Sequence, residues 1–260
     1  MQNLKITYSL EKHGFCFLPK VFTDKDSALC LESLWEIIKG KYQTGQKPEN
    51  RFWEIGDDPN SIIKIDKPHL CNQTVWNFIT NKTFGQFLGK TTQSKQVQVW
   101  HTQLVWKPRS KGFSGNAGWH RDAQYWPFWS EKGLYTAWIA LSNVTNNSGP
   151  VRYVSKSHVW ELVNGMDFFT RDLISQEETL LKTHKKYNVV EAILERGQVG
   201  VHSSLTYHSS KANKDNEPRV GLVVHFSTEK AERVKIKGEN KNYLDSLQDP
   251  WVSPIIYEQE

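Results

Sequence analysis

The chain has 260 residues with 33 basic and 28 acidic side chains, which gives a net charge of +5. A chain of this length can bury a full apolar core, and its mild, dispersed positive charge favours anionic small molecules over nucleic acid as partners. No stretch approaches the roughly 18 apolar residues of a membrane helix, and the N-terminus has no apolar signal region. We therefore expect a cytoplasmic protein, monomeric or homodimeric, that acts on a small molecule and binds neither membranes nor nucleic acid.

The cysteine content indicates no covalent or metal framework. Cys16, Cys30 and Cys71 are an odd number of cysteines and form no CxxC pair. A disulfide scaffold and a thiolate zinc site are therefore not expected.

Helical patterns occupy the N-terminal third of the chain. Thr23 with Asp26 three residues later forms a capping-box pattern, and apolar residues follow at helical spacing, which predicts a helix over 23–39. A weaker pattern predicts a second helix near 74–88. Together they predict a helical N-terminal part over about residues 1–90.

Beyond residue 95 the apolar pattern changes to a period of two, which is typical of strands. The predicted strands are 97–106, 134–141, 151–154, 189–194, 200–206 and 220–226. Turn-forming residues separate them at 146–150 and 211–218. Helices followed by many short strands predict a single α+β domain over 1–260, mainly β, with a sandwich or barrel core.

Two further segments stand apart from this pattern. The polar stretch 160–188 is interpreted as an insertion or lid. The last 34 residues carry several lysines and are predicted to form a solvated exterior surface.

Tryptophan is unusually frequent in the strand-rich part. Of eleven in the chain, six lie within 39 residues, namely Trp100, Trp106, Trp119, Trp126, Trp129 and Trp138. A core of bulky rings accounts for this, but some rings could instead line a ligand cavity. The sequence leaves both interpretations open.

Several common catalytic motifs are absent from the sequence. It contains no GxxxxGK[ST] phosphate loop, no GxGxxG after a strand, no GxSxG and no HExxH. Phosphoryl transfer, dinucleotide-dependent oxidoreduction, lipase-type hydrolysis and zincin proteolysis therefore lack their usual residues.

A candidate metal site is present instead. On an extended backbone, His120 and Asp122 present an imidazole and a carboxylate on one face, which is two thirds of the facial triad of non-haem Fe(II) sites. Such a pair alone is more often a surface strand pair. His208, at the end of the predicted 200–206 strand, would be the third ligand, and Arg219 opens the next strand eleven residues later. A buried Arg beside a metal with open positions favours a dianionic chelating cosubstrate, and 2-oxoglutarate fits.

Five separate segments occur in one order along the chain. They are the opening at 11–22, Trp-His-Arg-Asp at 119–122, Ser-Gly-Pro-Val-Arg-Tyr-Val to Lys-Ser-His at 148–158, Gly-Gln-Val at 197–199, and His-Ser-Ser to Pro-Arg at 208–219. In this order and spacing the chain resembles the phytanoyl-CoA dioxygenase family of Fe(II)/2-oxoglutarate-dependent oxygenases, over about residues 8 to 227. The Lys-Ser-His departs slightly from the family's usual Pro-Gly-Ser-His, at a structural turn.

The resemblance implies a double-stranded β-helix, or jelly-roll, core over about 95–227 flanked by N-terminal helices. It implies that His120, Asp122 and His208 bind Fe(II), with O₂ as the further reactant. The residues that it implies for 2-oxoglutarate binding are Arg219, Ser210, Trp138 and Gln103.

The same resemblance implies an enzyme that oxidises an unactivated C–H bond of a small organic molecule, by hydroxylation, with release of succinate and CO₂. Specialised or amino-acid-derived metabolism is the expected setting. Halogenating members of the family have Ala or Gly at the position of Asp122, so halogenation is not expected. Desaturation or oxidative ring formation, a non-catalytic 2-oxoglutarate-binding protein and a zinc hydrolase are the alternatives.

Candidate substrate contacts lie around the metal motif: Tyr125, Trp126, Arg121 and Phe113. Other histidines are interpreted as structural. His202 and His225, which strand alternation turns inward, are expected in the core or beside the metal. His13 and His69 are expected on the surface.

Overall fold

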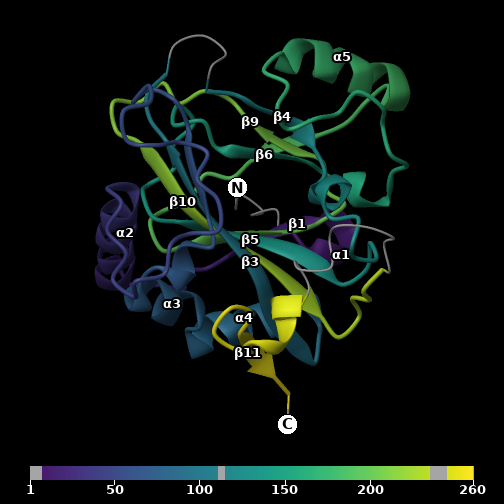
Figure 1. Cartoon of the computed structure of the whole chain (residues 1–260). Coiled ribbons are helices and arrows are strands. Elements are labelled where there is room, and N and C mark those ends of the chain that lie inside the picture. The colour runs from purple at the N-terminus through teal and green to yellow at the C-terminus, as the bar shows by residue number, and fades with distance from the viewer. Residues whose placement is uncertain (1–7, 111–114, 235–244, 260) are drawn as a thin grey trace, which may run out of the picture.

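The computed structural model of the protein describes residues 8–110, 115–234 and 245–259. Two antiparallel sheets face each other, helices α2 to α4 cover the outer side of the larger sheet, and α5 covers the smaller one (Figure 1). The helices of the described residues are α1 (Leu10–His13), α2 (Asp24–Ile38), α3 (Gln73–Ile79), α4 (Lys82–Thr92) and α5 (Leu173–His184). Short 3₁₀ helices lie at Pro68–Leu70, Asp122–Tyr125, Ser157–Val159 and Ser246–Gln248.

The larger sheet has seven strands in the order β1-β8-β5-β10-β3-β11, with β2 also paired to β3. Its strands are β1 (Phe15–Leu18), β2 (Ile63–Asp66), β3 (Gln96–Lys107), β5 (Leu134–Ala140), β8 (Val199–Ser203), β10 (Arg219–Thr228) and β11 (Ile255–Glu258). The smaller sheet has the order β4-β9-β6-β7. Its strands are β4 (Ala117–His120), β6 (Val151–Val154), β7 (Val189–Glu191) and β9 (His208–Ser210).

One face of the larger sheet packs into the main core, and the other lines a cavity; β10 shows this most clearly. Its apolar residues Val220, Leu222, Val224 and Phe226 join the main core beneath the helices. The alternate residues Arg219, Val223 and His225 line a cavity between the sheets. Because side chains along a strand alternate between faces, one strand supplies both the core and the site.

The predicted helix at 23–39 is confirmed as α2. The Thr23 side chain accepts a hydrogen bond from the backbone N–H of Asp26, and the Asp26 carboxylate accepts one from the backbone N–H of Thr23. This reciprocal pair satisfies two of the otherwise unpaired N–H groups at the helix start.

The prediction of one helix near 74–88 is wrong, because two helices occupy this region. α3 ends at Ile79, and Asn81 begins α4 by accepting a hydrogen bond from the N–H of Phe84 at 3.1 Å. Asparagine favours such caps because its short side chain competes with the backbone for hydrogen bonds.

Two predicted strands are shorter than expected. β7 ends at Glu191, with Leu194 forming only an isolated bridge to Val144. β8 ends at Ser203, so His208 does not follow directly on this strand. It begins β9 in the opposite sheet.

The predicted solvated C-terminal surface is confirmed for Lys230 and Arg233, which are exposed, but it is wrong for the end of the chain. β11 pairs with β3, and Leu247 and Ser253 are buried. The prediction failed because the partner of β11 lies about 160 residues earlier in the chain. Tail lysines 235, 237 and 241 lie outside the described residues.

The prediction of His13 and His69 at the surface is also wrong. His69 is fully buried, with Nδ1 2.6 Å from Thr102 Oγ1 and Nε2 3.1 Å from the Val252 carbonyl oxygen. His13 is buried as well, and its Nδ1 accepts a hydrogen bond from the N–H of Ser9. His69 thus joins segments that are distant in the sequence, whereas His13 caps its own short helix.

The polar segment 160–188 forms α5 and the loop before it. Its apolar residues Val163, Met166, Leu173 and Leu180 pack around Trp119 of β4 in a separate small core. This segment therefore covers the strand that ends at His120. In the described part of the chain, no helix has both the length and the apolar character needed to cross a membrane.

Candidate metal centre and active site

Three side chains from two strands converge on one point between the sheets. His120 ends β4, and Asp122 begins the next 3₁₀ helix, while Arg121 between them has an extended backbone (φ −109°, ψ 139°). His208 begins β9 and lies opposite His120 in the strand register. The three buried residues each offer one ligand atom, and these atoms lie within 4.8 Å of one another.

The hydrogen bonds of both imidazoles leave the same nitrogen available. His120 Nδ1 lies 2.8 Å from the Gly118 carbonyl oxygen, and His208 Nδ1 lies 3.0 Å from that of Thr206. Because a carbonyl only accepts, each Nδ1 donates and each Nε2 lone pair faces Asp122. Burial lowers the pKa of both imidazoles, that of His208 well below its usual value. Neutral imidazoles are the form that binds a metal ion.

Asp122 is held by two partners that are not themselves candidate ligands. Its Oδ2 accepts hydrogen bonds from the Thr136 hydroxyl at 2.6 Å and from His202 Nε2 at 3.1 Å. Its Oδ1 lies 3.7 Å from His120 Nε2 and 3.6 Å from His208 Nε2. Burial opposes ionisation, but the neighbouring His208 and His202 hold the pKa of Asp122 well below its usual range. The arrangement thus presents a carboxylate and two neutral imidazoles, a donor set suited to Fe(II).

The inner end of the cavity is basic. This inner compartment has a volume of about 110 Å³ and contains Arg219, which donates to the Gly149 carbonyl at 3.0 Å. The buried Nε of Arg219 has no hydrogen-bond partner among the described residues. Its guanidinium lies 5.0 Å from the centre of the Trp138 ring, which occupies the space over Gly221, where a Cβ would collide with the indole. Burial lowers the pKa of Arg219 to about 10, so it stays charged at neutral pH.

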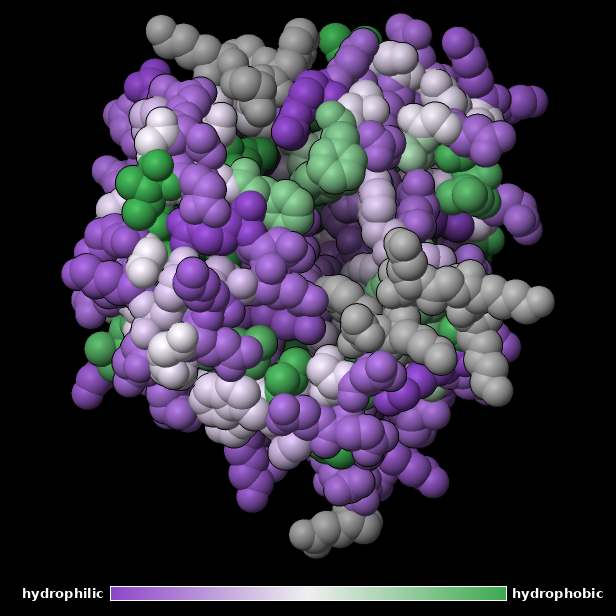
Figure 2. Space-filling view, in the orientation of Figure 1, coloured by the Kyte–Doolittle hydropathy of each residue, from purple (hydrophilic) through white to green (hydrophobic). Residues whose placement is uncertain are grey.

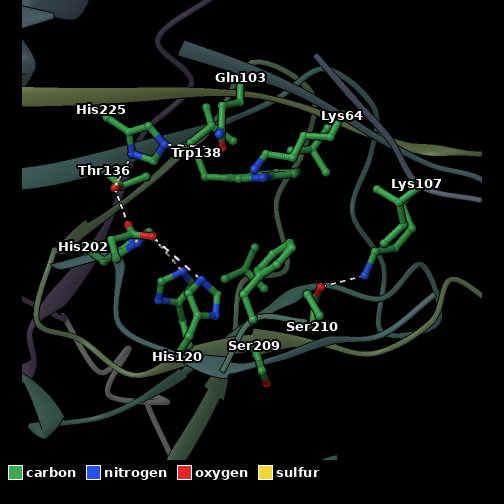
Figure 3. Close-up of a pocket in the computed structure, with 18 of the residues that line it drawn as sticks. Lys64, Gln103, Lys107, His120, Thr136, Trp138, His202, Ser209, Ser210 and His225 are labelled. Carbon is green, nitrogen blue, oxygen red and sulfur yellow. Dashed lines mark hydrogen bonds and ion pairs between the residues drawn. The ribbon is translucent and has the colours of Figure 1, made fainter. Parts of the chain in front are cut away.

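Lys107, which the sequence analysis missed, lines the same compartment as Arg219, and its side chain points to Ser210 (Figure 3). Its Nζ donates to Ser210 Oγ at 2.6 Å and to the Lys211 carbonyl at 2.7 Å. Burial, together with the charges of Arg219 and Arg171, lowers its pKa well below the usual value. Arg219 and Lys107 are two buried basic groups that form no ion pair with a carboxylate among the described residues. A bound dianion such as 2-oxoglutarate would favour the charged form of both.

The outer end of the cavity is aromatic. This outer chamber, of about 180 Å³, shares Lys64, His120 and Asp122 with the inner compartment. Phe168 also lines both parts, and the additional walls of the outer chamber are Tyr125, Trp126 and Phe169. Figure 2 shows this face of the molecule hollowed near its centre, with apolar side chains at the rim.

Segment 160–188 contributes two of these aromatic walls, Phe168 and Phe169. The Tyr125 hydroxyl donates to Asp167 Oδ1 at 2.9 Å and accepts from the N–H of Phe168 at 2.8 Å. The Phe168 ring meets the His120 ring edge-on, with ring centres 5.1 Å apart. The expected insertion therefore lies directly against the candidate metal centre.

Of the remaining predicted site residues, Gln103 lies in the cavity and Arg121 does not. Gln103 lines both parts of the cavity, and its Nε2 donates to Asp66 Oδ1 at 2.9 Å. Arg121 points away from the cavity, because its guanidinium donates to the carbonyls of residues 157, 160 and 161 and lies over the Tyr207 ring. Phe113 lies outside the described residues.

The sequence analysis missed three residues that line the cavity, Lys107, Thr136 and Lys64. For the first two, the alternation of side chains along a strand was the available signal. Lys107 lies two steps beyond Val105 and four beyond Gln103 on β3, so all three face the cavity. Thr136 precedes Trp138 by two on β5 in the same way. Lys64 lies between two core isoleucines of β2, a strand too short to be predicted.

The chain matches the model of the family described as Phytanoyl-CoA dioxygenase (PhyH) over residues 10–221. It is 22% identical over 160 residues to human peroxisomal phytanoyl-CoA dioxygenase, covering 57% of this chain and 45% of the relative. It is 21% identical over 220 residues to a probable phytanoyl-CoA dioxygenase of Caenorhabditis elegans, covering 80% and 64%. The matches thus span less than two thirds of these relatives' lengths.

Solved structures share the fold. The carbocyclase SnoK from nogalamycin biosynthesis has a TM-score of 0.69 at 18% identity, covering 92% of this chain and 88% of the other. The epimerase SnoN in complex with Fe³⁺, alpha ketoglutarate and nogalamycin RO has a TM-score of 0.66 at 21% identity, covering 87% and 83%. The expected α+β fold with a double-stranded β-helix core is thereby confirmed. With its intact His120, Asp122 and His208 triad, the chain belongs to the phytanoyl-CoA dioxygenase family of Fe(II)/2-oxoglutarate-dependent oxygenases.

Proposed function

We propose that this protein uses Fe(II) and 2-oxoglutarate to hydroxylate an unactivated C–H bond of a small organic molecule. One observation carries the proposal: a single buried cavity holds the two-histidine, one-carboxylate set in its wall and a pair of cations at its inner end. The first is suited to Fe(II) and the second to a dianion. A zinc hydrolase would leave the cations Arg219 and Lys107 without a role.

His120, Asp122 and His208 would hold the iron and leave three coordination positions open. When bound, iron supplies the oxidising chemistry with 2-oxoglutarate and O₂: substrate R–H, 2-oxoglutarate and O₂ become R–OH, succinate and CO₂. One oxygen atom enters the product and the other enters succinate. The protein's own contribution is to orient the reactants and exclude water.

The far carboxylate of 2-oxoglutarate would bind at the inner end of the cavity. The planar guanidinium of Arg219 suits a carboxylate, and Lys107 adds a second positive charge beside it. Ser210 holds the Lys107 ammonium, and the Trp138 ring forms an adjoining wall. Gln103 lies at the junction with the outer chamber and is proposed as a further polar contact.

The substrate would enter from the outer chamber, against Tyr125 and Trp126. These rings offer apolar area that orients a small molecule toward the iron position. Hydroxylation is the proposed outcome. Product analysis would reveal desaturation or ring formation in its place.

The test is succinate formation from 2-oxoglutarate by the Fe(II)-loaded enzyme in air, with product identification by mass spectrometry. We expect Asp122→Ala to lower the rate by at least about 100-fold. Removal of a residue that only hydrogen-bonds to a metal ligand already lowers metal affinity or activity by about 10- to 100-fold. Glu32→Ala on the exposed face of α2 is the matched control and should behave as the wild type. Unchanged turnover in Asp122→Ala would refute the ligand assignment. Cosubstrate binding without any turnover would favour a non-catalytic binding protein.

A further inference from the structure

Among the described residues, Lys64 is the one lysine or arginine shared by the inner compartment and the outer chamber. It lies on β2 opposite Val105 of β3, and its neighbours Ile63 and Ile65 pack into the main core. Strand alternation therefore turns Lys64 toward the cavity, which its side chain enters from β2 (Figure 3).

Aromatic rings hold the Lys64 ammonium. Its Nζ lies 4.7 Å from the centre of the Phe52 ring and 5.5 Å from that of Phe168. Within residues 8–110, 115–234 and 245–259, it makes no hydrogen bond or ion pair. Burial lowers the pKa of Lys64, which the carboxylates of Asp66 and Asp122 oppose. A half-buried lysine held only by ring faces has its hydrogen-bond donors available for a ligand.

The charges of the cavity also favour an anion. Its described lining carries three cationic side chains, Arg219, Lys107 and Lys64, against the single carboxylate of Asp122. Fe(II) and the dianion 2-oxoglutarate would cancel each other's charge, so the loaded site stays positive. Arg219 and Lys107 lie together at the inner end, which leaves Lys64 as the cation facing the substrate side.

We infer that Lys64 binds the carboxylate of a small substrate whose apolar or aromatic body lies against Tyr125, Trp126 and Phe168. The inference rests on the proposed function and adds the class of substrate to it. A lysine is a point charge on a flexible stem, so it fixes one end of the molecule. The aromatic walls then determine which C–H bond approaches the iron position.

The test compares carboxylic acids with their uncharged amides: 3-phenylpropanoic, indole-3-propanoic and cyclohexanecarboxylic acid, each with its primary amide. Binding is measured without turnover, by thermal shift and ligand-observed NMR on the anaerobic Fe(II)/2-oxoglutarate enzyme. We expect at least one acid to bind about tenfold more tightly than its amide, because a desolvated charge pair contributes more than 1.4 kcal/mol. Lys64→Met should bring this ratio close to one, while Lys64→Arg retains it. Lys90→Met, on the exposed side of α4, is the control and should match the wild type.

Three results would overturn the inference: no acid exceeds its amide in the wild type, the preference survives in Lys64→Met, or Lys64→Met weakens only 2-oxoglutarate binding. The last would assign Lys64 to the cosubstrate. If Lys64→Met does not fold, the wild-type comparison and Lys64→Gln decide. Failure of the proposed function itself is seen separately, as absence of 2-oxoglutarate binding before any probe is added.

Discussion

Thr136 connects the candidate metal centre to the polar network behind it. Its hydroxyl donates to Asp122 Oδ2 at 2.6 Å, so it must accept from His225 Nδ1, which lies 2.9 Å away. Burial lowers the pKa of His225 to about 3, so this imidazole is neutral. The direction of the chain is thereby fixed, from His225 through Thr136 to the carboxylate. One hydroxyl thus orients the only acidic candidate ligand of the triad.

We expect Thr136→Val to lower Fe(II) affinity by about 10- to 100-fold, because the valine retains the shape and removes the hydrogen bond to Asp122. Equilibrium dialysis of Fe(II) under anaerobic conditions measures this. Thr136→Ser restores the hydroxyl and should bind iron nearly as the wild type does. Equal affinity in the valine and serine variants would contradict a role for this hydrogen bond.

At the scale of elements, the C-terminal strand depends on a helix that precedes it by about 170 residues. β11 pairs with the start of β3 and packs on α4. The close approach requires glycine, since a Cβ at Gly85 would collide with the Ile256 carbonyl, and one at Gly89 with the Tyr257 ring. β3 in turn carries Lys107 at its far end. The C-terminal strand thus covers one end of the strand that reaches the cosubstrate pocket.

Gly85→Ala should destabilise the protein by about 1–3 kcal/mol, as overpacking does when backbone cannot move away. Chemical denaturation measures this, and limited proteolysis should cut before β11 earlier in the variant. Gln86→Ala changes the exposed neighbouring position of α4 and is the control, expected within about 0.5 kcal/mol of the wild type. If both variants are equally stable, the packing of β11 on α4 does not require glycine.

The lengths and sequence patterns of the strands explain which of them could be predicted from the sequence. The long strands β3 and β10 were predicted from their patterns of apolar residues, and β5 from its nearly continuous apolar run. β4 (Ala-Gly-Trp-His) and β9 (His-Ser-Ser) are short and carry no alternation of apolar residues, unlike the equally short β6 (Val-Arg-Tyr-Val). β2 and β11 were missed because their strand character comes from pairing with distant β3.

The residues of the candidate site likewise fall into those that the sequence predicted and those that it missed. His120, Asp122, His208 and Arg219 were predicted because motif order marks them. Thr136 and Lys107 lie at or next to predicted strands, but alternation alone does not say which face of a strand borders the cavity. Lys64 was missed because β2 itself was not predicted. Arg121 was predicted as a substrate contact, yet its extended backbone turns it away from its neighbours' face.

For the whole molecule, charge in the cavity links cosubstrate binding to stability. Arg219 and Lys107 are buried side by side, and within the described ranges neither forms an ion pair with a carboxylate. Burying like charges together raises the free energy of the folded protein. A dianion that binds both relieves this repulsion, and any ligand specific for the folded state stabilises it. The fold therefore holds two buried basic groups whose charged forms the proposed cosubstrate would stabilise.

The most direct test of the central claim is an anaerobic titration of the protein with Fe(II) and then 2-oxoglutarate, followed by visible absorption. Chelation of 2-oxoglutarate to Fe(II) held by the triad should produce a charge-transfer band that saturates with cosubstrate. Arg219→Ala and Lys107→Met should each weaken its formation by about 30-fold or more, the cost of leaving one partner of a buried charge pair unpaired. Iron binding without a band at saturating 2-oxoglutarate, or an unchanged titration in both variants, would contradict the account.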